Sequence, residues 1–313
     1  MNALTKVENN NIVLSQTVGA ELFNRFIAYL DTAPKTIETY TKALRQLFNY
    51  FSFNGITQPT REDLIAFRDE LKASGHKPTT IQNYITASKI FFSWTEQEGL
   101  YPNIANHLKG AKLDRNHKKD YLTTRQVKEV LASIERDTEQ GLRDYAILFL
   151  MITGGLRTIE IVRADIMDLR NAGDAVVLYI QGKGHEEKTE YIKVTPEVEQ
   201  AIRAYLKARG KADEDAPLFA STSNNNKGQR LTTRSISGIV KHRLQLAGYD
   251  SPRLTAHSLR HTAVTLSLLA GKDIGEVQQF ARHANIATTM IYNHALDKAK
   301  NSCSEAITQA IIS

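Results

Sequence analysis

The sequence predicts a mainly helical protein of two domains, with one small antiparallel β-sheet in the second domain. The chain has 313 residues, which suggests about two domains at roughly 100–200 residues each. Apolar residues recur at helical spacing through most of the chain, and 42% of all residues are hydrophobic, enough for ordinary packed cores. Only between residues 175 and 194 does the pattern change to short β-branched runs around a turn.

The first domain, residues 17–100, is predicted to be a bundle of four helices that follows a flexible N-terminus at residues 1–16. Pro34 suits the first turn of a helix, Thr60 can cap one, and Ser74-Gly75 can end one. Continuous apolar stripes then predict helices over residues 18–30, 34–51, 60–71 and 79–94. The short turns between them favour a compact bundle.

The net charge of +6 and a pI of about 9.2 have the sign that suits a polyanionic partner. A charged, solvated helix face explains the same residues without any partner. A linker with few apolar residues is expected at 101–120, and its basic run could cross a DNA backbone. The candidate phosphate contacts are Lys35, Lys42, Arg45, Lys77, Lys89, Lys118 and Lys119.

The second domain, residues 121–300, is expected to be helical around a small sheet. Thr123 or Thr124 can cap its first helix, and a strongly apolar helix covers residues 145–152. Strands are predicted at 175–180 and 189–194 with a turn between them, and helices resume from Pro196. A C-terminal tail follows at 301–313, with an apolar stripe that includes Ile307 and Ile311.

The sequence lacks the signatures of several classes of protein. Cys303 is the single cysteine, so no internal disulfide can form, and a reducing, cytoplasmic setting is expected. No run of about 18 apolar residues predicts a membrane span. The sequence has no phosphate loop, HExxH motif, cysteine pair or GxSxG motif, so neither a nucleotide, a metal nor another cofactor is expected.

Two segments have the chemistry that binds a phosphate. His257 and Arg260 are three apart, so on a helix they share one face, where a guanidinium fork and a titratable imidazole can meet an anion. Arg157 follows Gly154-Gly155 at the expected start of a helix, where anions are favoured. Arg157 could equally pair with Glu160 on the surface.

Three more side chains in the second domain extend this set. Lys183 lies between two glycines at the hairpin tip, and Lys188 is a rival in the same hairpin. His283 follows an amphipathic helix, and Tyr292 comes nine residues later. Each alone also fits ordinary surface or core packing; their occurrence together in one domain raises the interest of Tyr292.

These segments, in this order, resemble the tyrosine recombinase or phage integrase family, most closely its short Xer-type and mobile-element members. The resemblance covers roughly residues 123–295, with a weaker likeness to the family's N-terminal core-binding domain before it. It lies in four segments: residues 153–161 around Arg157, residues 182–184 around Lys183, residues 255–262 with His257 and Arg260, and residues 282–292 with His283 and Tyr292. The family usually has glycine where this chain has Arg282, and threonine where it has Gly154.

The resemblance implies a metal- and ATP-independent reaction in which Tyr292 attacks a DNA phosphorus and forms a 3′-phosphotyrosyl bond. Arg157 and Arg260 would hold the non-bridging oxygens, and Lys183 would protonate the leaving 5′-oxygen. His257 would act in acid–base transfer near Tyr292, and His283 would hydrogen-bond the phosphate. Glu160 would orient these groups.

The resemblance also implies four protomers that exchange strands through a Holliday junction on two double-stranded DNA sites, as a homotetramer or with a related recombinase. Residues 301–313 would then contact a neighbouring protomer, although a tail folded on its own domain fits equally well. The reaction would serve either Xer-like resolution or the integration and excision of a mobile element. No extra N-terminal arm-binding domain is evident, which mildly favours the Xer-like role. The alternatives are a type IB topoisomerase and a catalytically silent DNA-binding protein.

Overall fold

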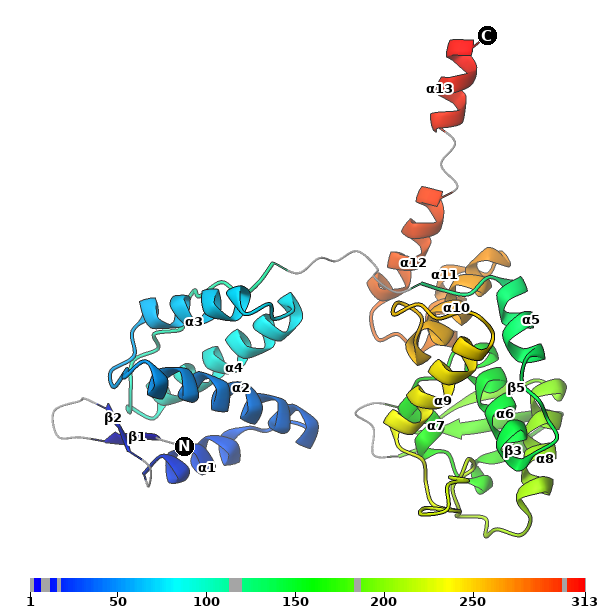
Figure 1. Cartoon of the computed structure of the whole chain (residues 1–313), viewed down its shortest axis with the longest axis horizontal. Coiled ribbons are helices and arrows are strands. Elements are labelled where there is room, and N and C mark those ends of the chain that lie inside the picture. The colour runs from blue at the N-terminus through cyan, green and yellow to red at the C-terminus, as the bar shows by residue number, and fades with distance from the viewer. Residues whose placement is uncertain are drawn as a thin grey trace. The chain divides into compact units, whose positions relative to one another are not determined.

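The computed structural model describes residues 3–6, 12–15, 18–112, 120–182, 187–299 and 303–312. It divides into two compact units, Met1–Arg115 and Asn116–Ser313. Figure 1 shows a helical first unit, and a second unit in which helices surround a small sheet. The predicted fold class is therefore confirmed.

Four helices make up most of the described part of the first unit, and two of them start at the predicted signals, Pro34 and Thr60. Pro34 and Pro78 stand in the first turn of their helices, and Thr60 makes a reciprocal capping box with Asp63. The helices are α1 (Val18–Tyr29), α2 (Pro34–Phe53), α3 (Arg61–Ala73) and α4 (Pro78–Gln97). Their buried faces meet in an aromatic core, where Phe91 lies edge-on to Phe26 with ring centroids 5.2 Å apart.

The N-terminal segment, expected to be flexible, contains two paired strands. Strand β1 (Ala3–Lys6) runs antiparallel to β2 (Ile12–Ser15), with Leu4 opposite Leu14. Apolar and β-branched residues in these short runs suit a strand, and pairing satisfies the backbone hydrogen bonds of both. The polar residues around them hide this pattern in the sequence.

The predicted linker begins later than residue 101, because residues up to 112 pack on the bundle. Ala105 and Leu108 are each 1% exposed within its core. The Tyr101 hydroxyl donates to the carbonyl of Pro59 at 2.6 Å. The prediction for 101–112 was wrong because two well-placed apolar side chains anchor a segment whose overall composition is polar. Lys118 and Lys119 lie outside the described residues.

The helices of the second unit surround a core centred on α6, which packs against α8 and α10. Thr123, as predicted, caps the first helix by a capping box with Gln126. The helices are α5 (Thr124–Ala132), α6 (Glu139–Thr153), α7 (Thr158–Arg163), the 3₁₀ turn η1 (Ile166–Asp168), α8 (Pro196–Arg209), α9 (Thr233–Leu246), α10 (Ala256–Leu269), α11 (Ile274–Ala281) and α12 (Ile286–Ala299).

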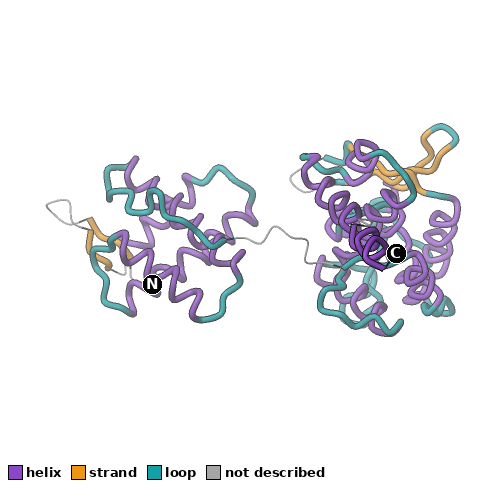
Figure 2. Tube along the Cα trace, turned by 90° about the horizontal axis from the view of Figure 1, so that it is seen from above, coloured by secondary structure: helices purple, strands orange, loops and turns teal. Residues whose placement is uncertain are grey.

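One antiparallel sheet completes this unit, and Figure 2 shows its strands gathered at one side of the helices. The order is β3 (Leu169–Ala172), β4 (Ala175–Ile180) and β5 (Glu190–Val194). The two predicted strands are β4 and β5. Strand β3 was not predicted, because three of its four residues are exposed and the apolar alternation that identifies a strand is missing.

The last helix, α13 (Cys303–Ile312), leaves its apolar stripe uncovered. Ile307 is 59% exposed and Ile311 is 77% exposed. None of the helices in the described ranges is long and apolar enough to cross a membrane.

Candidate active site

The turn between α6 and α7 brings Arg157 into the site. Gly155 has a φ of +57°, and a Cβ there would lie 3.0 Å from the Phe280 ring, so glycine fits both the backbone and the close approach of α11. Arg157 then caps α7, and its backbone N–H donates to Glu160 at 2.7 Å. The carboxylate of Glu160 thus occupies the helix start where the sequence suggested an anion.

Glu160 is 0% exposed and organises two guanidinium groups. Arg157 donates to its Oε1 at 2.8 Å, and Arg282 donates to its Oε2 at 3.1 Å. Burial would raise the pKa of Glu160, but the charge of Arg282 and the hydrogen bonds from Arg157 outweigh it and hold the pKa below its ordinary value. The predicted pair of Arg157 and Glu160 exists, with its acid buried rather than on the surface.

Arg260 lies in α10 and is 1% exposed. It donates to the carbonyl of Gly155 at 2.6 Å and also to the carbonyl of Ala281. Burial, together with the like charges of Arg157 and Arg282, lowers the pKa of Arg260 to about 10. The group remains a cation at neutral pH, with a charge that little solvent screens.

Arg282 occupies the left-handed turn at the end of α11, with a φ of 53°. Glycine adopts this conformation at least cost, which explains why the resembling family usually has glycine here. The side chain compensates with contacts to the carbonyls of Phe280 at 2.8 Å and Gly155 at 3.1 Å, besides Glu160. Its Nε is buried without a hydrogen-bond partner.

Tyr292 lies in α12 and is 8% exposed. Its ring packs in a small cluster with Val264, Val277 and Ala281, which joins α10, α11 and α12. Its hydroxyl shares a hydrogen bond with Nδ1 of His261. Burial raises the pKa of Tyr292 to about 12, although the charge of Arg260 acts in the opposite direction.

Two histidines contact this tyrosine, and a third lies behind one of them. His283 shares a hydrogen bond between its Nδ1 and the Thr289 hydroxyl at 2.8 Å, and its ring stacks 6.2 Å from that of Tyr292. Burial and the charges of Arg260 and its neighbours lower the pKa of His283 to about 4, so this imidazole is neutral at pH 7. His257 is exposed on α10, and its ring meets that of His261 edge-on at 4.5 Å.

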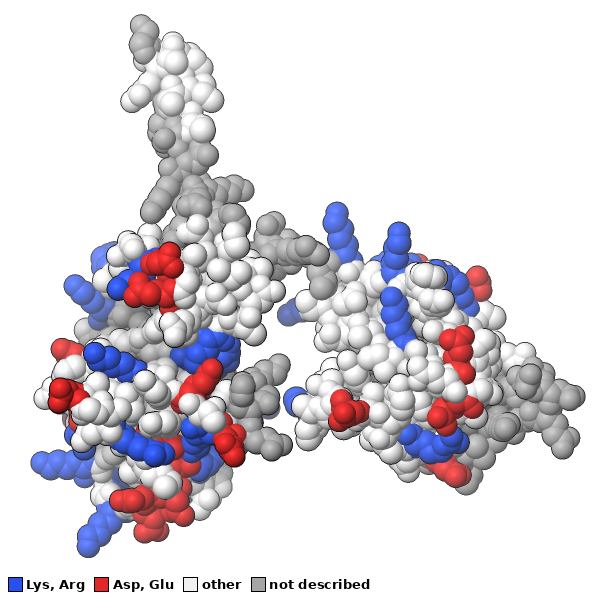
Figure 3. All heavy atoms as spheres, turned by 180° about the vertical axis from the view of Figure 1, so that it is seen from behind, with Lys and Arg blue, Asp and Glu red and all other residues white. Residues whose placement is uncertain are grey.

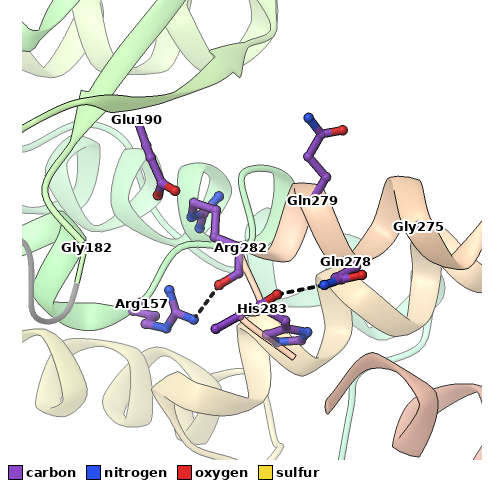
Figure 4. A pocket seen from close by; sticks show the side chains of 9 residues that line it. Arg157, Gly182, Glu190, Gly275, Gln278, Gln279, Arg282 and His283 are labelled. Atoms are coloured by element: carbon purple, nitrogen blue, oxygen red, sulfur yellow. Dashed lines mark hydrogen bonds between the residues drawn. The ribbon is translucent and has the colours of Figure 1, made fainter. Parts of the chain in front are cut away.

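A cavity of about 650 Å³ opens beside these groups, lined by Arg157, Arg282, His283 and Gln278 among others. Figure 4 shows Arg157 donating to the Arg282 carbonyl and Gln278 donating to the His283 carbonyl across its floor, at 3.1 and 3.0 Å. Gly182, at the base of the β4–β5 hairpin, also lines it and accepts a hydrogen bond from Arg163 at 2.9 Å. The cavity wall therefore offers several groups that bind an oxyanion, alongside the carboxylate of Glu190.

Lys183, the predicted hairpin cation, lies outside the described residues. Its rival, Lys188, forms ion pairs with Asp165 and Asp168, at 2.5 Å each. Lys188 therefore anchors the hairpin to η1, and its role in this structure is to hold the two segments together.

The predicted basic contacts of the first unit differ in their surroundings. Lys35 and Lys42 both pair with Glu38 at 2.6 Å, and the first of these hydrogen bonds contributes most to lowering the pKa of that acid to about 2. Arg45 and Lys77 are exposed, and Lys89 lines a second cavity of about 610 Å³. Figure 3 shows basic and acidic side chains interspersed on the visible face of each unit.

The structure thus brings five predicted residues into one cluster: Arg157, Glu160, Arg260, His283 and Tyr292. His257 lies next to it through His261. Sequence reasoning missed His261 as a partner of Tyr292 and Arg282 as a partner of Glu160. The spacing of His257 and His261, four residues apart on one helix face, is the signal that could have found the first.

Comparisons with known proteins agree on one family. The model of the Phage integrase family matches residues 120–299, and that of the phage integrase N-terminal SAM-like domain matches residues 23–99. Tyrosine recombinase XerC of Herpetosiphon aurantiacus is 32% identical over 86% of this chain and 89% of its own length. Tyrosine recombinase XerA of Pyrococcus furiosus is 28% identical over 90% and 92%.

Solved structures share the fold. The XerH site-specific recombinase bound to palindromic difH substrate aligns with a TM-score of 0.71 at 24% identity, over 86% of this chain and 80% of that one. The Tn1549 transposon integrase in complex with transposon right end DNA aligns with a TM-score of 0.69 at 20% identity, over 87% and 93%. The family match spans more than half of the chain, so this protein belongs to the phage integrase family, the tyrosine recombinases.

Proposed function

We propose that this protein cuts and rejoins double-stranded DNA at a specific site through a 3′-phosphotyrosyl bond to Tyr292. The observation that carries the proposal is the position of this buried phenol, whose ring stacks on that of His283 in the wall of the arginine-lined cavity. A covalent link stores the energy of the broken phosphodiester, which the second step uses for rejoining. The family of the chain favours this recombinase reaction over relaxation or silent DNA binding.

The guanidinium groups would stabilise the five-coordinate phosphorus during both steps. The side chain of Arg157 is 30% exposed beside the cavity, so one edge of it can meet a phosphate oxygen, while Glu160 holds the other. Arg260 supplies a fixed, poorly screened charge. Such preorganised charges cost no reorganisation when the transition state forms, and they are usually the largest single catalytic contribution.

The remaining roles divide among the smaller groups. His283 is a neutral imidazole that would hydrogen-bond a phosphate oxygen, and Glu160 orients the arginines. Lys183 would protonate the leaving 5′-oxygen, and His257 would take part in acid–base transfer near Tyr292. Tyr292 is protonated at neutral pH, because burial raises its pKa to about 12. A base must therefore take its proton during the attack.

The DNA would be a duplex with a defined recombination site, held by both units of the protein in the cytoplasm. Basic residues of the first unit, Lys35, Lys42, Arg45, Lys77 and Lys89, would contact phosphates, as would Lys118 and Lys119. Four protomers would assemble on two such sites and exchange strands through a Holliday junction. Helix α13 supports this assembly, because exposed Ile307 and Ile311 suit burial against a neighbouring protomer.

A denaturing capture of covalent adducts from fragmented genomic DNA tests the proposal. We expect wild-type protein to retain DNA that clusters at one sequence, and Tyr292→Phe to retain none while it still binds that sequence. Tyr191→Phe is the matched control, because Tyr191 is 58% exposed on β5, and this variant should behave like wild type.

Other outcomes of the capture contradict the proposal in separate ways. Adducts scattered without sequence preference would indicate a topoisomerase. Absence of adducts from wild type, with sequence-specific binding intact, would indicate a silent DNA-binding protein. Adducts that persist in Tyr292→Phe would place the nucleophile elsewhere.

A further inference from the structure

We propose that His261 is the proton acceptor for the Tyr292 hydroxyl during DNA cleavage, and that it returns the proton during rejoining. This inference rests on the proposed function, in which Tyr292 is the nucleophile. It adds a catalytic residue that the resemblance did not supply, because the resemblance assigns acid–base transfer to His257.

The first support is contact with the reacting atom. His261 is 4% exposed, and its Nδ1 shares a hydrogen bond with the Tyr292 hydroxyl. The ring centroids lie 5.1 Å apart with an angle of 39° between the planes, so the imidazole approaches the phenol oxygen by a ring nitrogen. With Nδ1 unprotonated, His261 accepts this hydrogen bond, and the proton already lies on the line of transfer.

The second support comes from the positions of the other histidines. The His283 ring is nearly parallel to the Tyr292 ring, at 18° and 6.2 Å, and its Nδ1 is engaged with Thr289. His257 is exposed and meets His261 edge-on, 4.5 Å between centroids. His257 is thus the solvent-exposed neighbour of the buried His261.

The third support is chemical need. Tyr292 is buried and does not ionise at neutral pH, so its proton must leave as the bond to phosphorus forms. In cleavage, the Tyr292 Oη–P bond forms, the P–O5′ bond breaks, the phenol proton passes to His261 Nδ1, and the 5′-oxygen takes a proton from the general acid. Rejoining reverses each transfer, so the His261 imidazolium reprotonates the departing phenol.

The test compares His261→Asn with His242→Asn, a control at an exposed position on α9. Asparagine can still accept a hydrogen bond from Tyr292 but cannot take its proton. On DNA carrying the site recovered from wild-type adducts, we expect His261→Asn to form adduct about 100- to 10,000-fold more slowly. The control should cleave like wild type, and both variants should bind DNA with unchanged affinity.

Two substitutions of the reactants separate proton acceptance from structural support. A 5′-bridging phosphorothiolate, whose sulfur leaves without protonation, should not restore the rate of His261→Asn. A fluorinated tyrosine at position 292, whose phenol ionises near neutral pH, should restore most of it, because no acceptor is then needed. The fluorinated tyrosine in the wild-type background shows whether the analogue itself is tolerated.

Three outcomes overturn the proposal. Wild-type rates in His261→Asn would remove any need for this acceptor. Rescue by the phosphorothiolate would place His261 on the leaving-group side of the reaction. A slow variant that the fluorinated tyrosine does not restore would make His261 only a packing residue. If Tyr292→Phe still forms adducts, the proposed function fails first, and this inference fails with it.

Discussion

Two clusters of buried charged residues lie in the second unit, and they differ in how far protein groups satisfy their arginines. The Asp144 cluster consists of Arg143, Asp144 and Arg243; the Glu160 cluster consists of Arg157, Glu160, Arg260 and Arg282. Asp144 accepts from Arg143 on one oxygen, at 2.7 and 3.0 Å, and from Arg243 on the other, at 2.7 and 2.9 Å. Arg143 also donates to the Ala220 carbonyl and the Thr222 hydroxyl, so this cluster is closed.

The Glu160 cluster has three guanidinium groups for one carboxylate and lies beside a cavity. Arg260 and Arg282 donate to backbone carbonyls, and the side chain of Arg157 is partly exposed. The Nε of Arg282 is buried without a hydrogen-bond partner. The comparison shows that buried arginines alone do not identify a site. What distinguishes the Glu160 cluster is its larger excess of cations over carboxylates, beside an open cavity.

The largest effect is expected from breaking the closed cluster. Asp144→Asn leaves Arg143 and Arg243 facing each other without their shared anion, in side chains that are 5% and 14% exposed. We expect the second unit to lose about 3–5 kcal/mol of unfolding free energy, because removal of one partner leaves buried charge uncompensated. Urea unfolding followed by circular dichroism measures this. Cleavage per folded molecule should be unchanged, and its selective loss would show that the cluster also serves the reaction.

Breaking the open cluster should affect the reaction instead. Arg260→Ala is expected to slow adduct formation about 100- to 1,000-fold, because a preorganised charge at the phosphate is lost. The unfolding free energy should fall by less than in Asp144→Asn, since the substitution also relieves repulsion with Arg157 and Arg282. Single-turnover cleavage and urea unfolding on the same preparation separate the two effects. A large loss of unfolding free energy with normal cleavage would show that the Glu160 cluster serves stability rather than the reaction.

Arg282 offers a finer comparison, because its backbone and side chain act in opposite directions. Arg282→Gly relieves the left-handed strain and removes a partner of Glu160, whereas Arg282→Ala removes the partner and keeps the strain. The glycine variant should be about 1 kcal/mol more stable than the alanine variant. Both should cleave more slowly than wild type by a similar factor. Equal stability of the two variants would mean that the turn adjusts without cost.

The smallest effect concerns pH and His283. Its pKa falls from the ordinary value of 6.5 to about 4 in the folded protein. Protonation therefore favours the unfolded chain, so the contribution of His283 is fully present above about pH 6.5 and declines as the pH falls towards 4. His283→Asn should flatten the dependence of unfolding free energy on pH within that window. An unchanged slope would show that folding does not shift the pKa of His283.

Local signals predicted most of the fold. Pro34, Thr60 and Thr123 start helices where their chemistry requires, and β4 and β5 follow β-branched runs. Segments held by tertiary contacts could not be read in this way. Strand β3 has no buried alternation, and residues 101–112 depend on Ala105 and Leu108 reaching a distant core.

In the candidate site, too, local motifs were predictable and long-range contacts were not. The order of its motifs predicted Arg157, Arg260, His283 and Tyr292 as a set, because each lies in a short recognisable segment. The contacts of His261 and Arg282 join segments far apart in sequence, α10 to α12 and α11 to α7. No local pattern specifies the contact between Arg282 and Glu160. The four-residue spacing of His257 and His261 places two histidines on one helix face but does not indicate that Tyr292 meets them.

The buried Arg260 has a consequence for the lifetime of the protein between encounters with DNA. Its pKa of about 10 reflects the free energy spent in keeping a cation desolvated among other cations. A phosphate that enters the site returns part of this energy, so ligand and folding are linked: what binds the native state alone raises its stability. The free protein is accordingly the less stable form, and binding of a substrate relieves a strain that the fold alone must otherwise carry.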